Sequence, residues 1–144
     1  MSSDLFTVAG SARAQQKVKG SKFIALAYSV ETIDEFKLRL GNLRNEYRDA
    51  SHICYAYRLF SGFTIFEGPN TSEYQSDDGE PRGSAGLPIL NVLKRNHMIN
   101  TVVFVIRYFG GHKLGIPGLI DAYSSSAQSA LQDRDKVRWI ATRT

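Results

Sequence analysis

A nearly unbroken apolar run, TVVFVI, occupies positions 101–106 of the 144-residue chain. A run of this kind is typical of a strand that is covered on both faces. The chain continues as RYFGGHKLGIPGL at positions 107–119, where glycines interrupt any regular pattern. Apolar residues then recur at helical spacing from Leu119 to Leu131. This region is therefore predicted to form a strand, a glycine-rich loop and a final helix.

Two more helices are predicted upstream of this strand. Pro88 at a first helical turn indicates a short helix that ends near Asn96. Thr32 as N-cap and Glu35 three residues later form a capping box. Apolar residues at helical spacing extend that earlier helix to near Arg48.

Two hairpins complete the pattern. Segments 14–19 and 22–30 predict a hairpin that turns at Gly20-Ser21, and segments 52–60 and 63–66 predict another that turns at Ser61-Gly62. Residues 1–12 form a loose lead-in, and residues 133–144 are left unassigned. The order β-β-α-β-β-loop-α-β-loop-α predicts a single α/β domain over residues 1–144. We expect an α+β two-layer sandwich with helices on one face of a mixed sheet.

The composition indicates a soluble globular domain. Hydrophobic residues make up 42% of the chain and charged residues 22%. No segment approaches the roughly 20 apolar residues of a membrane span, and residues 1–20 lack the apolar core of a signal peptide. A single cysteine excludes an internal disulfide and suits a reducing compartment. We therefore expect a cytoplasmic protein without a membrane partner.

The charge is unevenly distributed along the chain. Residues 1–60 carry nine Lys and Arg against six Asp and Glu, residues 61–86 one against five, and residues 87–144 eight against three. An acidic segment thus separates two basic ones. Basic surface of this size is compatible with nucleic acid or an acidic protein, and is also common on proteins that bind neither.

The acidic segment contains the loop SDDGEPRGSAG at positions 76–86. Asp77, Asp78 and Glu80 are possible oxygen ligands for a hard cation. Their spacing does not match a calcium-binding loop, and acids near turns more often accept backbone N–H groups or pair with arginine. We therefore predict no metal site, but an acidic loop that forms salt bridges with Arg82, Arg107 or Lys113.

The second loop combines glycines with a lysine. Lys113 lies between Gly110-Gly111 and Gly115, directly after the strand. Glycine N–H groups, the N-terminus of the last helix near Gly118 and the cations Arg107 and Lys113 are suited to a phosphate. The spacing matches neither G-x-x-x-x-G-K-[ST] nor G-x-G-x-x-G, so a tight turn without a ligand is the alternative.

His52 and Cys54 are two residues apart on a predicted strand, so their side chains share a face. Such a pair could be a nucleophile with its base or half of a zinc site. No second H-x-C or C-x-x-C pattern completes a zinc site, and a free cysteine is most often a small buried hydrophobe. Aromatic residues at positions 55–66 could stack on bases, although core packing explains most of them.

Four segments together resemble the IMPACT family, whose bacterial members are called YigZ-like. They are SKFIA at 21–25, ASH with CYAY at 50–57, SDDGEP with AG at 76–86, and RYFGG with KLG at 107–115. The resemblance extends from about residue 21 to residue 131, includes Tyr108, and concerns the N-terminal domain of the family. It implies a fold like the second domain of the fifth small-subunit ribosomal protein, which a domain of elongation factor G shares.

The resemblance also has functional implications. Eukaryotic members restrain, through a large partner protein, a kinase that phosphorylates a translation initiation factor. Many bacterial members carry a second, ferredoxin-like domain, which we expect to be absent here. Ile53, Leu87, Pro117 and Asp121 differ from the residues usual in the family. The changes at Leu87 and Asp121 remove basic groups, which weakens the case for anion binding.

Two functions follow as expectations. The first is a non-enzymatic binding domain that contacts RNA, a ribonucleoprotein or a translation-related protein, with no cofactor and no catalytic residue. The second is an enzyme that acts on a small phosphorylated or nucleotide substrate, with Asp77, Asp78 or Glu80 as acid, base or metal-holding group. Both require that the acidic loop and the glycine–lysine loop line one mixed-charge cleft.

Overall fold

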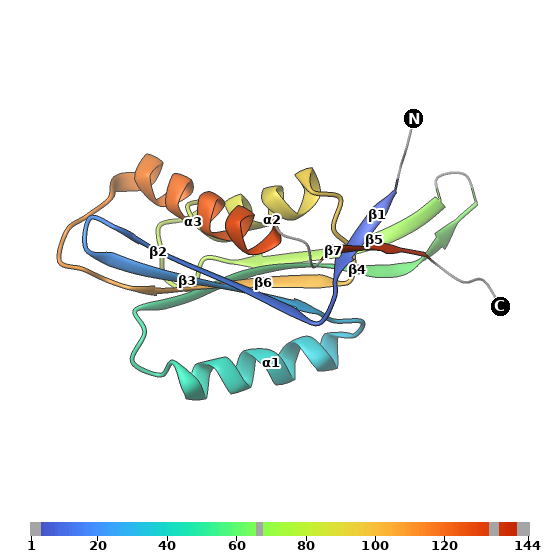
Figure 1. The fold of residues 1–144 in the computed structure, drawn as a ribbon, viewed down its shortest axis with the longest axis horizontal. Coiled ribbons are helices and arrows are strands. Elements are labelled where there is room, and N and C mark those ends of the chain that lie inside the picture. The colour runs from blue at the N-terminus through green and yellow to red at the C-terminus, as the bar shows by residue number, and fades with distance from the viewer. Residues whose placement is uncertain (1–3, 66–67, 133–135, 141–144) are drawn as a thin grey trace.

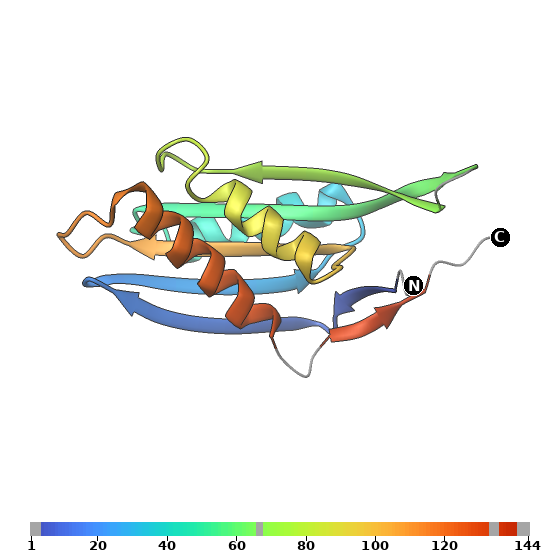
Figure 2. The same cartoon turned by 90° about the horizontal axis from the view of Figure 1, so that it is seen from above.

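The computed structural model describes residues 4–65, 68–132 and 136–140. In chain order the elements are β1 (Leu5–Val8), β2 (Ser11–Val18), β3 (Ser21–Ser29), α1 (Ile33–Glu46), β4 (His52–Thr64), β5 (Gly68–Ser76), α2 (Gly86–Arg95), β6 (Thr101–Tyr108), α3 (Gly115–Leu131) and β7 (Lys136–Trp139). Five strands form one sheet in the order β2-β3-β6-β4-β5. The apolar run at 101–106 lies in β6, the middle strand of this sheet (Figures 1 and 2).

Helices cover both faces of the sheet. Helix α1 lies on one face, and α2 and α3 lie on the other (Figure 1). Along β6, Val102, Phe104 and Ile106 belong to the core beneath α1, whereas Val103 and Val105 belong to the core beneath α2 and α3. This alternation is the period of two that a strand imposes on its side chains. A strand that is apolar at every position therefore contributes side chains to two hydrophobic cores.

The α+β class and its main elements are confirmed, but two predicted details are wrong. The expected mixed sheet is antiparallel in every pairing among the described strands. The helices do not lie on one face, because β6 has apolar side chains on both sides and each side must be covered. The predicted two-layer sandwich is therefore a sheet between two helical layers.

The second predicted hairpin is also wrong. No turn forms at Ser61-Gly62, because β4 continues through them to Thr64 with a register shift between Phe60 and Phe63. Gly62 has a φ of +104°, a value that suits a bulge. The strand pairs instead with β5, whose largely exposed sequence GPNTSEYQS carries no apolar alternation. Phe66, predicted to end the second strand, lies outside the described residues.

The first hairpin and the first two helices form close to their predicted positions, but the hairpin turn lies one residue earlier than predicted and α3 begins at Gly115 rather than near Leu119. Strands β2 and β3 turn at Lys19 and Gly20, whose φ values are +47° and +82°. The Thr32 side chain accepts a hydrogen bond from the Glu35 N–H, which caps α1. The lead-in and the tail were not predicted as strands, yet β1 and β7 pair with each other as a two-stranded ribbon. None of the helices in the described ranges combines the length and the apolar character that crossing a membrane requires.

Candidate functional site

The acidic loop and the end of β6 are joined by a buried ion pair. The Arg107 Nη1 donates to both carboxylate oxygens of Glu80, at 3.1 and 2.8 Å. Both side chains are almost fully buried, with 5% and 3% of their surface exposed. Arg107 lies on the α2/α3 face because the alternation along β6 continues from Val103 and Val105. The pair links the acidic loop to the end of β6, between residues that are 27 positions apart in sequence.

The other polar atoms of this pair are also satisfied. Ser21 Oγ accepts from Arg107 Nε and Nη2 at 3.3 and 3.2 Å, and from the Gly110 N–H at 3.2 Å. The Tyr123 hydroxyl of α3 donates to Glu80 Oε2. The guanidinium also lies 5.6 and 5.4 Å from the ring centroids of Phe23 and Phe109. Residues from four parts of the chain therefore hold one charge pair.

A close approach of two glycines brings the loops together. A Cβ built on Gly110 would lie 2.0 Å from the carbonyl carbon of Gly20 and 2.4 Å from the Ser21 nitrogen. No side chain fits there, so the β2–β3 turn can touch the loop after β6 only because both residues are glycines. At this position the glycine is required for backbone packing rather than for a ligand.

Two acids of the loop have structural partners. The Asp77 carboxylate accepts from the N–H groups of Gly83, Ala85 and Gly86 at 2.9, 3.1 and 2.8 Å. It therefore caps α2, whose N-cap residue provides no side-chain bond of its own. Asp78 Oδ2 accepts from the Ile53 N–H of β4 at 2.7 Å. Both carboxylates thus fasten the loop to neighbouring elements.

His52 lies at the edge of the same network. It is opposite Arg107 in the β4–β6 register, and its Nδ1 is 2.8 Å from the main-chain oxygen of Asp78. A carbonyl oxygen only accepts, so Nδ1 carries the proton and donates it. The Nε2 then faces Glu80 Oε1 at 3.5 Å. The imidazole is therefore held in one orientation, between the acidic loop and the ion pair.

Cys54 and Tyr123 are buried beneath the ion pair. Both are fully buried, and the thiol donates to the main-chain oxygen of Asp77 at 3.0 Å. Desolvation by burial raises the pKa of the Cys54 thiol far above its usual value, and the charge of Glu80 adds to this rise. Desolvation likewise raises the pKa of Tyr123, with Cys54 and Glu80 as further causes. A thiol in this state is a packing group rather than a nucleophile.

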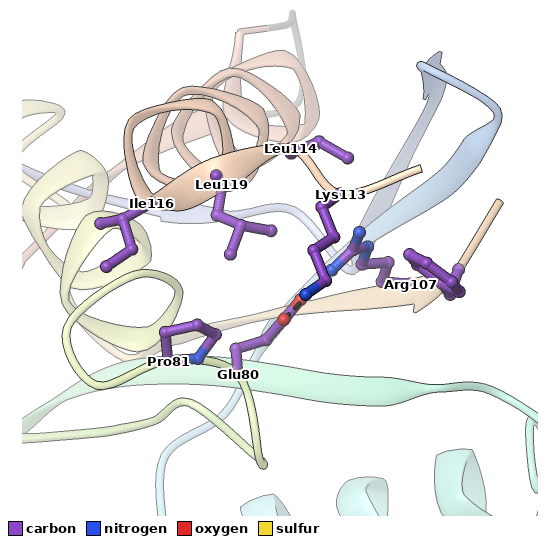
Figure 3. Close-up of a pocket in the computed structure, with 9 residues that line it drawn as sticks. Glu80, Pro81, Arg107, Lys113, Leu114, Ile116 and Leu119 are labelled. Atoms are coloured by element: carbon purple, nitrogen blue, oxygen red, sulfur yellow. Dashed lines mark hydrogen bonds and ion pairs between the residues drawn. The ribbon is translucent and has the colours of Figure 1, made fainter. Parts of the chain in front are cut away.

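Above the ion pair lies a cleft of about 290 Å³. Its walls come from both loops and the first turns of α3: Glu80, Pro81, Arg107, Phe109, Lys113, Leu114, Gly115, Ile116 and Leu119. Lys113 and Glu80 extend into it from opposite sides (Figure 3). Phe109 and Ile116 are each 52% exposed, which is high for large apolar side chains. The expected shared cleft is therefore present, and its walls are more apolar than predicted.

A second, more open hollow of about 560 Å³ lies beside the cleft. It is lined by Lys19, Gly20, Gly110, His112 and Lys113, without an acidic side chain. Lys113 borders both hollows, and no ion pair is formed by its ammonium group among the residues that the structure describes. The cationic side of this site is therefore made by the β2–β3 turn and the loop after β6.

The remaining predicted residues have varied positions. Tyr108 belongs to the α1 side of the sheet and donates to Asp49 at 3.1 Å, away from the cleft. Gly111 has a φ of +88°, as a tight turn requires, and Arg82 is exposed. Gly118 packs within α3, where an added Cβ would lie 3.1 Å from the Cβ of Leu114.

Sequence reasoning missed Ser21, Tyr123 and Phe109 as parts of the site. A serine and a tyrosine carry no motif, and only the pairing of β3 with β6 and the packing of α3 bring them to Glu80. Phe109 lies in the predicted glycine-rich loop, and a large aromatic residue in that loop was the one signal that the sequence offered. In the described ranges no three His, Cys, Asp or Glu side chains are grouped as a metal site would require.

Comparison with known proteins shows similarity over most of the chain. Residues 19–131 match the family model described as "Impact N-terminal domain". The chain is 36% identical over 126 residues to the IMPACT family member YvyE of Bacillus subtilis, a match that covers 88% of this chain and 55% of that protein. It therefore spans little more than half the length of this relative.

Two solved structures are similar. A hypothetical protein superposes with a TM-score of 0.82 at 29% identity, over 96% of this chain and 65% of the other. The two-domain translational regulator Yih1 superposes with a TM-score of 0.50 at 26% identity, over 88% of this chain and 46% of that one. With the family model covering most of its length, this chain belongs to the IMPACT family and contains its N-terminal domain.

Proposed function

We propose that this domain is a non-enzymatic binding module of translation regulation in the cytoplasm. We assign it an anionic partner, held at the cleft and the adjoining hollow. The proposal depends on which charged groups at the site are paired within the protein and which are not. Glu80 and Arg107 neutralise each other, whereas Lys113, Lys19 and His112 border open space without an acid among them. The similarity to the translational regulator Yih1 supports a role in translation.

RNA or a ribonucleoprotein is the first candidate partner. Lysines around an open hollow suit phosphate groups, and the half-exposed ring of Phe109 beside them offers a face for base stacking. The guanidinium of Arg107 is paired inside the protein, so Lys113 carries the contact in its place. The expected interaction is electrostatic and independent of base sequence.

Titration with mixed RNA and with ribosomes at low salt tests this assignment. Lys113→Ala should weaken binding and reduce the slope of log affinity against log salt by about 1, the effect of one lost phosphate contact. Lys94→Ala, which removes an exposed lysine from the last turn of α2, is the matched control and should leave both unchanged. Binding that is indifferent to Lys113→Ala would contradict the proposal.

A translation-related protein is the second candidate, because the cleft walls are mainly apolar. An exposed Ile116 beside a free ammonium group suits a protein segment that combines an apolar side chain with an acid. A partner that remains bound after nuclease treatment and is lost with Ile116→Asp would favour protein over RNA.

The enzyme alternative gains less support from the geometry. Asp77 caps a helix, Asp78 fastens β4 and Glu80 is neutralised by Arg107, so each acid has a structural use. A thermal-shift screen with nucleotides, sugar phosphates and divalent ions should give no stabilisation. A reproducible rise in melting temperature with any of these ligands would restore the enzyme hypothesis.

A further inference from the structure

A second groove lies on the opposite face of the sheet, between α1 and strands β4 and β5. It encloses about 500 Å³. Phe36 and Leu40 of α1 form one wall, and the rings of Tyr55, Tyr57 and Tyr74 form the floor. One helix covers this face of the sheet, whereas two helices cover the other face (Figure 1). The groove shares no lining residue with the cleft at Glu80.

The helix wall of this groove contains a glycine that the fold does not need. Gly41 lies in the interior of α1, where glycine destabilises a helix by roughly 1 kcal/mol relative to alanine. Its φ is outside the positive range, and a Cβ built on it meets nothing within 4 Å. Neither backbone conformation nor packing within the chain therefore requires glycine here. Its effect is to leave open space beside the helix backbone at this wall of the groove.

The charged rim of the groove has one sign. Lys37 and Arg44 lie on either side of Gly41 along α1, and no Asp or Glu lines the groove. Asp78, which lies near Tyr55, is engaged by the Ile53 N–H. Tyr74 is 53% exposed, so the part of the aromatic floor that it forms stays in contact with solvent, whereas Tyr55 and Tyr57 are buried. A cationic rim above an aromatic floor is complementary to a segment with acidic and large apolar side chains.

The floor also ends in an open strand edge. Strand β5 is the last strand of the five-stranded sheet, and no described element lies beyond its outer edge in Figure 2. An exposed edge offers backbone N–H and C=O groups to an extended chain. These backbone groups suit a peptide, whereas RNA would need exposed ring faces, and only Tyr74 among the three tyrosines is not buried. The edge therefore favours a peptide occupant.

We propose that this groove binds an extended acidic peptide segment of a partner protein. A large apolar side chain of that segment inserts beside Gly41, and its acidic residues pair with Lys37 and Arg44. The site is independent of the cleft at Glu80, so each can fail without the other.

The test uses the whole 144-residue chain and an array of short synthetic peptides. The peptides range from strongly acidic to strongly basic, each with or without one phenylalanine or leucine. Acidic peptides with an apolar anchor should bind best. Gly41→Leu should fill the groove and weaken their binding by about tenfold or more, the loss expected when an anchor loses its pocket.

Stability separates blockage from misfolding. Leucine is a better helix former than glycine and meets open space at this position, so Gly41→Leu should melt no lower than the parent chain. Asn42→Leu adds the same side chain to an exposed position that does not line this groove and should keep full affinity. Lys37→Glu combined with Arg44→Glu should shift the preference toward basic peptides.

Three results would overturn the proposal. They are the absence of binding by any peptide class, binding that Gly41→Leu leaves unchanged, and a preference for basic peptides in the parent chain. An oligouridylate is included as the RNA arm. If it bound more tightly than the acidic peptides and also lost affinity in Gly41→Leu, the groove would be an RNA site instead.

Discussion

At the residue scale, the pairing of Arg107 with Glu80 holds the cleft together. Removing two charges from water is costly, and their attraction offsets that cost only when the geometry is good and the other polar atoms are satisfied. Ser21 and Tyr123 supply those additional bonds. Among the described residues no buried side-chain nitrogen or oxygen lacks a partner. The pair is thus a fully satisfied network, and removal of one member leaves the other charge buried and unpaired.

Glu80→Gln should lower the free energy of unfolding by about 3–5 kcal/mol, the usual cost of leaving one partner of a buried ion pair alone. Urea denaturation measures this loss as a lower midpoint at unchanged slope. Glu73→Gln is the matched control, because Glu73 pairs with Arg58 at the surface at 2.8 Å and 27% of its side chain is exposed. Its cost should be at most about 1 kcal/mol. Equal losses in the two variants would refute the structural role assigned to Glu80.

At the element scale, α2 depends on an acid from outside the helix. Its first residue, Gly86, is the last residue of the acidic loop, and the chain folds back so that Asp77 accepts from three N–H groups near the helix start. An added Cβ at Gly86 would lie 2.8 Å from the Ser76 backbone, so the helix start lies directly against β5. The conformation of the acidic loop and the start of α2 therefore stabilise each other.

Asp77→Ala should destabilise the domain by about 1–2 kcal/mol, the cost of a lost helix cap. Hydrogen exchange should accelerate first at the amides of Ala85 and Gly86, which lose their acceptor. Asp121→Ala, at an exposed position of α3, serves as the control and should change stability by less than about 0.5 kcal/mol. Unchanged exchange at the start of α2 in the Asp77 variant would count against the capping role.

At the scale of the whole molecule, β6 connects two cores. Its side chains alternate between the layer under α1 and the layer under α2 and α3. A substitution in either core therefore also affects β6, which packs against the other core. This arrangement makes cooperative unfolding the expected behaviour of the domain. Groups that stay protonated at alkaline pH only in the folded state then influence the stability of the whole domain.

Alkaline pH should destabilise the domain for this reason. Burial raises the pKa of Cys54 above 9.0 and that of Tyr123 above 10.0, their ordinary values. Above pH 9 the unfolded chain releases protons that the folded chain keeps, so the free energy of unfolding falls as pH rises. Each such group contributes a slope of up to about 1.4 kcal/mol per pH unit.

Thermal denaturation between pH 8 and pH 11 measures this slope. Cys54→Ala should flatten the decline most at its onset near pH 9, because the unfolded thiol begins to titrate before the unfolded tyrosines do. The stabilising contribution of the thiol is fully present below its unfolded pKa of 9.0 and is lost progressively as the pH rises above that value toward the raised pKa of the folded state. A parent chain whose melting temperature stays constant up to pH 11 would show that these groups are not buried in solution.

Local signals were enough to predict part of this protein. The Thr32 cap of α1, the hairpin at Gly20 and the apolar run of β6 depend on neighbouring residues, and all three appear in the structure. The predicted capping box is only half formed, because the Glu35 carboxylate accepts from the Glu31 N–H rather than from the Thr32 N–H. The motifs of the two loops were likewise sufficient to recognise the family. Each of these features depends on residues that are close together in the sequence, so it could be predicted without knowledge of distant contacts.

Other features depended on contacts between distant residues. Strand β5 has a polar sequence and is a strand only because β4 pairs with it, and β1 and β7 pair across almost the whole chain. The sequence left several acids as possible partners of Arg107, and the folding of the acidic loop against the end of β6 places Glu80 beside it and buries both side chains. Because Arg107 is buried and paired with Glu80, it has a structural role rather than the predicted anion-binding one. Among the described residues, Lys113 is then the unpaired cation that lines the cleft. Those outcomes follow from desolvation and long-range pairing, which no short stretch of residues encodes.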